Sequence, residues 1–555
     1  MGRKTNFLKS SLEDASFNII LQILFRGVTF FLNAFVLRHV TQDVIGVMNV
    51  RLLLLESTLL FLSREAFRRA CLTKTVDHNW PQVINLLWLT VPICTVLSVI
   101  FGSIWLHFLT LPDTSITEHY YIGVWAMALS CILEMTVEPL YLVSQAFLFV
   151  RLRVVLELLI VGVRTVTFTC LVLRSPKDAV IAFSAAQMLS ISSYVVCFYL
   201  YFMHYTNQKC MISSSSSDDK TAKLSRRNSL EDEFPFSSIS DFLPSLEKVK
   251  GESLVDWKLV TLIISFMKQG ILKQILTEGE RYIMTLFSML SFNEQGVFDV
   301  VNNLGSLAAR FLFRPIENSA YFYFSQLVNR DVPIKDQNKK SMVEAAIVLE
   351  QLLHCVSSLG LIVFCFGQAY SRLLLFLYGG PTFSIGLGPL LLRTHCLAVL
   401  FLAVNGITEC YALATMNTKE LDRFNHKMIY LSMLFLFFSW LFTKYFGSVG
   451  FIFANCCNMA FRIMHSVKFI NERYRDSPFK PLNGLKPGKL FLSTSITSCI
   501  LTLISEYFFF QDSKILHFCL GGVCFLITVG AWAYEERDLV KFALEKFKKS
   551  SEKKE

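Results

Sequence analysis

A succession of long apolar segments constrains the fold of this chain more than any other feature. A helix needs roughly 20 mainly apolar residues to cross the hydrocarbon core of a bilayer, and the 555-residue sequence repeats runs of about that length between short polar segments. Only 17% of the residues are charged, whereas about 25% is typical of soluble domains. A water-soluble globule of this composition would expose a large apolar surface and aggregate. The pattern therefore predicts an all-α polytopic membrane protein.

The hydropathy pattern predicts about fourteen transmembrane helices, six before a polar insert, six after it and two more at the C-terminal end. We expect them at residues 16–37, 44–63, 83–107, 121–146, 154–173, 178–202, 257–289, 296–327, 343–369, 389–415, 428–442, 450–467, 490–509 and 515–534. The insert contains a serine run and mixed charge, with few apolar residues before Phe234. A segment of that kind cannot bury a core, so we predict a flexible linker.

This order predicts two pseudo-symmetric six-helix lobes followed by two added helices. The expected parts are an N-terminal lobe (1–203), a flexible cytosolic linker (204–256), a C-terminal lobe (257–467), the two added helices (468–534) and a basic cytosolic tail (535–555).

The distribution of positive charge predicts the orientation of the helices. With the N-terminus placed in the cytosol, the cytosolic segments hold 36 Lys and Arg residues and the segments on the opposite side hold 6. Cytosolic loops of membrane proteins are enriched in Lys and Arg, so both termini are predicted to be cytosolic. The net charge of +10 is thereby explained by topology, and we expect no binding of nucleic acid.

A shift of 250 residues brings the second predicted helix of each half into register. Gly46 then aligns with Gly296, Phe61 with Phe311 and Arg64 with Arg314, within seven identities in nineteen ungapped positions. Because the first half contains six helices, an even number, both halves begin on the same side of the membrane and the repeat is predicted to be parallel. Transporters of this design bind their substrate between the two halves.

Several charged residues lie inside the predicted helices, where a charge costs about 2.5–3.5 kcal/mol on insertion scales and faces a partner or a water-filled cavity. Lys273, Thr277 and Glu280 or Arg281 are spaced at i, i+4 and i+7 or i+8, on one helical face, in a predicted span (257–289) that is long enough to be bent or broken. Basic residues outnumber acidic ones, and the arginine fork suits phosphate, so the pattern predicts a cavity for an anionic ligand. The candidate substrate-binding residues are Arg26, Arg64, Arg68, Lys273, Glu280, Arg281, Asn302, Arg310, Arg314, Glu317 and Arg462.

Four other intramembrane cations receive a structural interpretation, because charges can also pair between helices or extend to the membrane surface. They are Arg51, Arg164, Lys258 and Arg393. The fifteen cysteines include no C-x-x-C pair with metal-ligand spacing, so we interpret them as small buried residues. We expect no metal site and no cofactor.

Six motifs at these positions resemble the Rft family. They are Arg64-Glu-Ala-Phe-Arg-Arg-Ala70, Lys273-Gln-Ile-Leu-Thr-Glu-Gly-Glu-Arg281, Asn302-Asn-Leu-Gly305, Arg314-Pro-Ile-Glu317, Asn405-Gly-Ile-Thr-Glu409 and Gly447-Ser-Val-Gly-Phe451. The resemblance runs from about Phe17 to Tyr534 and leaves out the linker and the basic tail.

The resemblance implies membership of the multidrug/oligosaccharidyl-lipid/polysaccharide exporter superfamily. It implies a multi-pass protein of the endoplasmic reticulum membrane, in contact with membrane lipids. The implied substrate is a dolichol-diphosphate oligosaccharide with five mannoses on two N-acetylglucosamines, which passes from the cytosolic to the lumenal leaflet for N-glycosylation. A non-transporting accessory protein of the same pathway remains an alternative, as does a cation-coupled exporter of the same fold using Glu56, Glu138 or Glu280.

Two enzymatic readings are excluded by the sequence. A dolichol-dependent glycosyltransferase would be expected to carry an acidic metal-binding pair in a sizeable lumenal loop, whereas the predicted lumenal loops are short and Asp218-Asp219 lies in the linker. An ATP-driven pump needs a G-x-x-x-x-G-K-[ST] loop, and Gly484-Leu-Lys-Pro-Gly-Lys489 has the wrong spacing. We therefore expect a transport protein and no enzyme.

Overall fold

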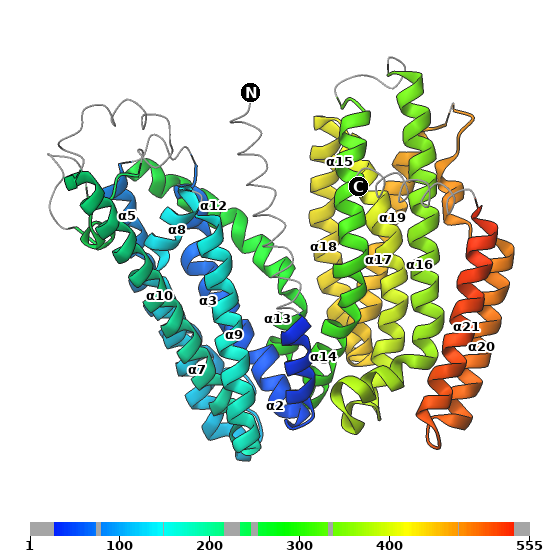
Figure 1. Cartoon of the computed structure of the whole chain (residues 1–555), viewed down its shortest axis with the longest axis horizontal. Helices are drawn as coiled ribbons and strands as arrows, with labels where there is room; N and C mark the ends of the chain where they lie inside the picture. The colour runs from blue at the N-terminus through cyan, green and yellow to red at the C-terminus, as the bar shows by residue number, and fades with distance from the viewer. Residues whose placement is uncertain are drawn as a thin grey trace. The chain divides into compact units, whose positions relative to one another are not determined.

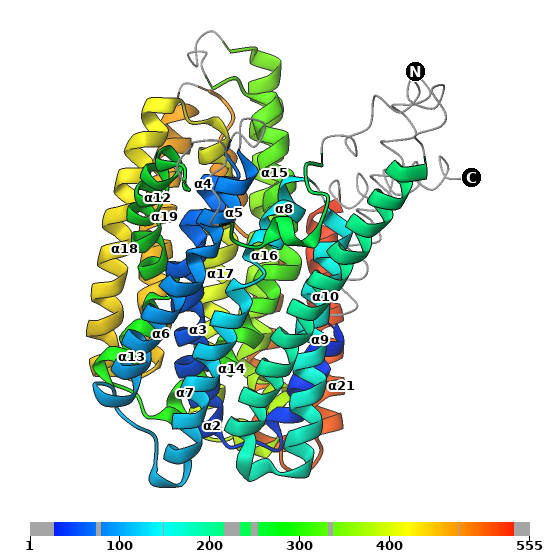
Figure 2. The same cartoon turned by 90° about the vertical axis from the view of Figure 1, so that its left-hand side faces the viewer.

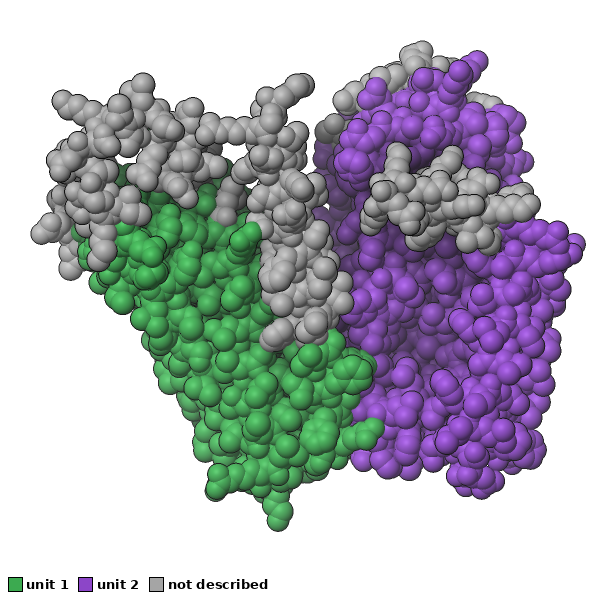
Figure 3. Space-filling view, viewed as in Figure 1, with its two compact units in different colours: residues 1–296 green, residues 297–555 purple. Residues whose placement is uncertain are grey.

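The computed structural model describes residues 27–73, 79–147, 149–215, 234–245, 254–330, 337–475 and 477–537; for residues 210–215, 272, 276 and 418 it describes the backbone alone. Within these ranges every regular element is a helix and no strand occurs (Figures 1 and 2). The predicted class, an all-α polytopic membrane protein, is confirmed. The chain divides into two compact units, Met1–Gly296 and Val297–Glu555 (Figure 3).

The first unit is built around one long helix that changes its winding twice. This helix runs from Gln42 to Cys71 and consists of α2 (Gln42–Gly46), the π-helical turn η1 (Val47–Leu52), α3 (Leu53–Leu60), the π-helical turn η2 (Phe61–Glu65) and α4 (Ala66–Cys71). The other helices are α5 (Trp80–Trp88), α6 (Thr90–His107), α7 (Thr114–Met135), α8 (Glu138–Ala146), α9 (Val150–Arg174), η4 (Pro176–Asp178), α10 (Ala179–Ser215), η6 (Ile239–Phe242), α12 (Trp257–Thr277) and α13 (Gly279–Phe287). Helices α3 and α6 pack against α7, which also packs against α10.

The second unit is a bundle in which α17 packs against both α16 and α19. Its helices are α14 (Phe292–Ala308, which begins in the first unit), the π-helical turn η7 (Ala309–Phe313), α15 (Arg314–Leu327), α16 (Lys339–Gly379), η9 (Pro381–Phe383), α17 (Leu387–Thr415), α18 (Thr418–Phe446), α19 (Val449–Arg473), η10 (Pro481–Leu485), α20 (Lys489–Phe509) and α21 (Lys514–Glu535). The hairpin of α20 and α21 lies against α16.

The number of spans differs from the sequence prediction. Among the described residues, nine helices are long and apolar enough to cross a membrane, and eleven spans result if each of two bent helix pairs counts as one. The predicted number of about fourteen is therefore not confirmed. Predicted spans 296–327 and 450–467 are helical but are not among the eleven; they carry Arg310, Arg314 and Arg462. Span 16–37 begins outside the described residues, and its described part is the short apolar helix Gly27–Leu37.

Two helices are much longer than predicted. Helix α10 has 37 residues and α16 has 41, which at 1.5 Å per residue is about 55 and 60 Å, against a hydrocarbon core of about 30 Å. Hydropathy marks only the part of a helix that fits the bilayer. A helix continues into water wherever its polar residues allow, and this continuation leaves no hydropathy signal.

Part of the predicted flexible linker is packed. Phe234, Phe236 and Phe242 are buried in an aromatic cluster of the first unit. The Asn85 side chain accepts a hydrogen bond from the Ser245 amide (2.8 Å) and donates one to its carbonyl (2.9 Å). The prediction overlooked this because three phenylalanines within nine residues can fill a preformed aromatic pocket without building a core of their own. The boundaries predicted for the two lobes stay a proposal.

Two structural features match the repeat found by the 250-residue shift. A shift of 250 residues maps residues 61–63 of η2 onto residues 311–313 of η7, so both aligned helices contain a π-helical turn at the same place. Such turns are rare and occur often at functional sites. The aligned glycines also contact reciprocally: a methyl group on Gly46 would overlap the Phe292 carbonyl, and one on Gly296 would overlap the carbonyl of Gln42. Gln42 and Phe292 are themselves aligned by the same shift.

The Gly447–Phe451 motif forms the turn between α18 and α19. Gly447 ends α18 with a φ of 60°, a conformation that glycine adopts at no steric cost. A methyl group on Gly450 would overlap the backbone of Phe442 and Thr443. Phe451 is fully buried, with its ring 5.5 Å from that of Phe298.

We therefore expect Gly450→Ala to destabilise the protein by about 1–3 kcal/mol, because backbone atoms cannot move aside for the methyl group as a flexible side chain would. Thermal unfolding in detergent tests this expectation. The matched control is Gly522→Ala in α21, where a methyl group would meet nothing within 4 Å; helix propensity favours that change by about 1 kcal/mol. Equal melting temperatures for the two variants would contradict the packing argument.

Candidate functional site

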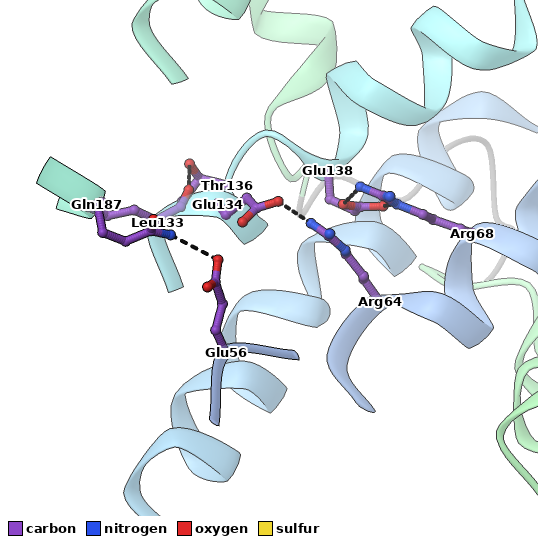
Figure 4. A network of polar contacts seen from close by, with 8 residues as sticks. All are labelled: Glu56, Arg64, Arg68, Leu133, Glu134, Thr136, Glu138 and Gln187. Atoms are coloured by element: carbon purple, nitrogen blue, oxygen red, sulfur yellow. Dashed lines mark hydrogen bonds and ion pairs between the residues drawn. The ribbon is translucent and has the colours of Figure 1, made fainter. Parts of the chain in front are cut away.

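Arg64 lies in the π-helical turn η2 and Arg68 lies one turn later in α4, and each forms an ion pair with a carboxylate. Arg64 pairs with Glu134 near the end of α7, and Arg68 pairs with Glu138 at the start of α8 (Figure 4). Helices α7 and α8 meet at a bend of 46°. Two ion pairs, with a spacing of four residues on each side, therefore attach the long Gln42–Cys71 helix to this bend.

The Arg68–Glu138 ion pair is the more deeply buried of the two. Glu138 has a side-chain exposure of 1% against 18% for Arg68. The guanidinium of Arg68 donates two hydrogen bonds to this carboxylate, one of them with an Nη2–Oε2 distance of 2.8 Å, and lies 3.8 Å from the centroid of the Tyr141 ring. Glu138 therefore has its charge compensated within the protein. That arrangement disfavours Glu138 as the free carboxylate of a cation-coupled exporter.

Glu56 belongs to a separate polar chain in the same unit. Its Oε1 accepts a hydrogen bond from the Gln187 side chain at 2.9 Å, and Gln187 in turn accepts one from Arg164 at 3.2 Å. Figure 4 shows the link between Glu56 and Gln187, which connects α3 to α10. The structural role predicted for Arg164 is in keeping with this contact.

The predicted single face of Lys273, Thr277 and Arg281 is wrong in its geometry. The helix breaks at Glu278, and α12 and α13 form a bent pair with an angle of 70°. A glycine follows the break, because Gly279 begins α13, and glycine disfavours a continuous helix. Lys273 is exposed and Glu280 is partly buried.

Polar contacts attach the break to α3. The carboxylate of Glu278 lies 3.2 Å from the Arg281 guanidinium and accepts a hydrogen bond from Ser57 at 3.1 Å. The hydroxyls of Thr58 and Tyr282 share a hydrogen bond of 2.8 Å. Arg281 therefore reaches a carboxylate on its own segment. Sequence reasoning missed Glu278, although an acidic residue three positions before an arginine on a helix is a recognisable pairing signal.

In the second unit, Arg310 and Arg314 stand apart from the other candidate arginines. Both are exposed, and the described residues give neither of them an ion pair. Arg310 lies in the π-helical turn η7, and Arg314 begins α15. Asn302 is partly buried on α14, one turn before Gly305, where a methyl group would overlap the ring of His395. Among the candidate arginines that the structure describes, these two are the ones without a salt bridge.

Glu317 and Arg462 meet the Asn405–Glu409 motif of α17. A methyl group on Gly406 would overlap the Glu317 carboxylate, so this glycine makes room for it. The Glu409 carboxylate receives Arg462 at 2.5 Å and the Asn405 amide at 3.0 Å. The two motifs therefore form one polar contact region in the bundle, in which Arg462 has its charge compensated.

Arg26 lies outside the described residues. Glu134, Glu138, Glu278 and Glu409 are the pairing residues that the candidate set omitted. Within the described ranges no group of three or more His, Cys, Asp or Glu side chains could hold a metal ion. The arrangement is therefore suited to binding an anion through Arg310 and Arg314, while the paired arginines position helices.

The segment Gly484–Lys489 superficially resembles a phosphate-binding loop, but the backbone amides that directly follow it already bind a carboxylate of the protein. The Glu535 carboxylate accepts hydrogen bonds from the backbone amides of Leu490 and Phe491 at 2.8 and 3.0 Å. It lies over Gly488, where a methyl group would overlap it. A helix N-terminus attracts anions, and here the protein supplies the anion itself.

The sequence matches one protein family along nearly its whole length. The profile of the Rft protein family matches residues 10–546. A Drosophila melanogaster protein named Man(5)GlcNAc(2)-PP-dolichol translocation protein RFT1 is 45% identical over 547 residues, which cover 97% of this chain and 98% of the relative. The Xenopus tropicalis protein of the same name is 43% identical over 539 residues, 96% of each chain.

Two solved structures share the fold at low sequence identity. The lipid II flippase MurJ in an inward closed conformation has a TM-score of 0.57 at 11% identity, covering 94% of this chain and all of that one. An inward-facing multidrug resistance MATE family transporter has a TM-score of 0.54 at 10% identity, covering 81% and 96%. These likenesses concern the fold alone.

Proposed function

The chain belongs to the Rft protein family, and from this premise we propose that it moves a dolichol-diphosphate-linked Man5GlcNAc2 oligosaccharide from the cytosolic to the lumenal leaflet of the endoplasmic reticulum membrane. The observation that carries the proposal is 45% identity along almost the whole length of a relative named for translocation of this lipid. The substrate would then serve protein N-glycosylation.

The charges of the second unit support an anionic head group. A dolichol diphosphate carries negative charge next to its sugars, and charge-assisted hydrogen bonds to phosphate oxygens are the strongest that an arginine makes. Arg310 and Arg314 are exposed and have no ion pair among the described residues. Arg64, Arg68 and Arg462 would contribute by holding their helices in place, because a carboxylate compensates each of them.

Reconstitution tests the proposal directly. Purified protein in liposomes should equilibrate a labelled Man5GlcNAc2-diphosphate-dolichol between the two leaflets, measured as the fraction that an added membrane-impermeant glycosidase or lectin reaches. Protein-free liposomes and liposomes with a heat-denatured sample are the controls. Unchanged leaflet distribution, together with restored N-glycosylation when the same protein is returned to deficient cells, would favour the accessory function instead.

The charge distribution gives a further expected result. With 36 positive charges on one side against 6 on the other, epitope tags at residue 215 and at the C-terminus should both face the cytosol. Protease added to sealed microsomes should remove both tags, while a lumenal marker survives. Protection of either tag would require a different number of spans before it.

A further inference from the structure

Arg51 is the largest fully buried side chain of the described residues. It lies in the π-helical turn η1, in the membrane-spanning helix Gln42–Cys71. The interpretation of Arg51 as paired or extended to the membrane surface is wrong, because its exposure is 0% and no described carboxylate pairs with it. A buried charge without compensation is very costly.

Only one nitrogen of the Arg51 guanidinium has a hydrogen-bond partner. Nη2 donates to Thr110 Oγ1 at 2.9 Å, whereas Nε and Nη1 have none. The Phe292 ring, whose centroid is 5.2 Å away, contributes a weak attraction. The guanidinium therefore keeps its charge and has two nitrogens, Nε and Nη1, available as donors in a buried place.

Hydroxyl groups converge on the same place from three other segments. Thr110 and Ser288 share a hydrogen bond of 3.1 Å, and Ser288 is the one described non-glycine residue with positive φ, at 47°. Tyr120 lies on α7, which packs against the π-helical turn η1 that contains Arg51, and its hydroxyl is buried without a partner. The backbone turn that holds Arg51 is itself fixed by a hydrogen bond of 3.1 Å from the Trp105 indole to the Arg51 carbonyl.

These groups are the donors that an anion requires. We propose that Arg51, Thr110, Tyr120 and Ser288 bind a small inorganic anion of about the size of chloride. The bound anion would compensate the guanidinium and accept hydrogen bonds from Nε or Nη1 and from the Tyr120 hydroxyl. Thr110 and Ser288 are exposed while Arg51 and Tyr120 are buried, so the two aliphatic hydroxyls form the accessible side of the site.

The burial of Arg51 limits the size of the ligand. A diphosphate joined to a lipid and an oligosaccharide would need the guanidinium to be exposed, whereas a halide needs room for one atom. The site is therefore distinct from the substrate site under the proposed function and does not depend on it. Its effect would be on folding, because a ligand that binds only the folded state stabilises that state in proportion to the logarithm of its concentration.

Halide-dependent thermal unfolding tests the site. The purified protein in detergent is titrated with sodium chloride against sodium gluconate at constant ionic strength. We expect a saturable rise in melting temperature on the order of a few degrees at about a hundred times the Kd, and the same with bromide. Inorganic pyrophosphate at the same ionic strength should give no rise that depends on Arg51, so any rise that it causes should be the same in the wild type and in Arg51→Met.

Three variants complete the test. Arg51→Met should melt at the same temperature in chloride and gluconate, and Tyr120→Phe, which keeps the ring, should need at least several-fold more chloride. Arg393→Met is the matched control: Glu506 compensates that arginine at 2.7 Å, so this variant should be less stable but keep the full response. The absence of a saturable halide response in the wild type, or an undiminished response in both Arg51→Met and Tyr120→Phe, would overturn the proposal in favour of water. A response to pyrophosphate and not to halide, lost in Arg51→Met, would assign the residues to a larger anion and overturn it as well.

Discussion

An Arg68→Ala variant is expected to lose about 3–5 kcal/mol of unfolding free energy, because it leaves the Glu138 carboxylate buried without its partner. Glu138 is 1% exposed and accepts two hydrogen bonds from this guanidinium. A cation–π contact with Tyr141 is lost at the same time. Denaturant or thermal unfolding of the purified protein in detergent, followed by helix content, measures the loss.

Two further variants separate the buried pair from a general effect of removing arginine. Arg69→Ala is the control, because Arg69 pairs with Glu65 inside one helix and both side chains are about one-third exposed; the expected loss is about 0.5 kcal/mol or less. The double variant Arg68→Met with Glu138→Leu should recover most of the stability, since no charge is left buried. Equal losses for Arg68→Ala and Arg69→Ala would refute the argument.

Joint replacement of Arg310 and Arg314 by alanine is expected to reduce transport of the oligosaccharide lipid more than tenfold while leaving the melting temperature unchanged. Each charge-assisted hydrogen bond to phosphate is worth about 1.5–3 kcal/mol, and neither arginine is held by a described ion pair. Leaflet equilibration in liposomes and glycosylation in complemented cells measure the effect.

The matched control is joint replacement of Lys419 and Arg423 on α18. Arg423 is exposed in the same unit, and the double change removes the same formal charge from a segment that is predicted to be cytosolic. It should leave transport within about twofold of the wild type. Normal transport by the Arg310 and Arg314 variant at equal protein level would remove these residues from the substrate site.

The fold class could be predicted because the length of an apolar segment is a local property of the sequence. Most of the predicted spans lie within helices of the structure, but their ends do not agree, since α10 and α16 continue as helices in their polar parts. The length of predicted span 257–289 allowed a bend or break, but its position at Glu278 could not be predicted because one glycine in an apolar run is an ambiguous signal. The docking of Phe234 was missed because its aromatic pocket comes from distant segments.

The candidate site residues stay a proposal, and the sequence did not predict which of the candidate arginines form ion pairs. Intramembrane arginines are conspicuous in the sequence, whereas Glu134 lies 70 positions from the Arg64 that it compensates. One signal was available. The arginines at 64 and 68 and the glutamates at 134 and 138 have the same spacing of four, which two ion pairs between neighbouring helices require. The isolation of Arg51 had no signal at all, because only packing shows which side chains fail to find a carboxylate.

The reciprocal contact of Gly46 and Gly296 has a consequence for how this crossing tolerates mutation. In a symmetric homodimer an isologous contact presents one residue twice, so a single mutation alters both copies together. Here the contact has the same reciprocity, yet its two glycines are specified at separate places in the chain. A larger side chain at either position pushes the two helices apart, and the glycine that remains at the other position cannot restore their close contact. This contact is thus as sensitive to mutation as the interface of a symmetric dimer. Two independent codons must each retain glycine to preserve the close approach of the two helices.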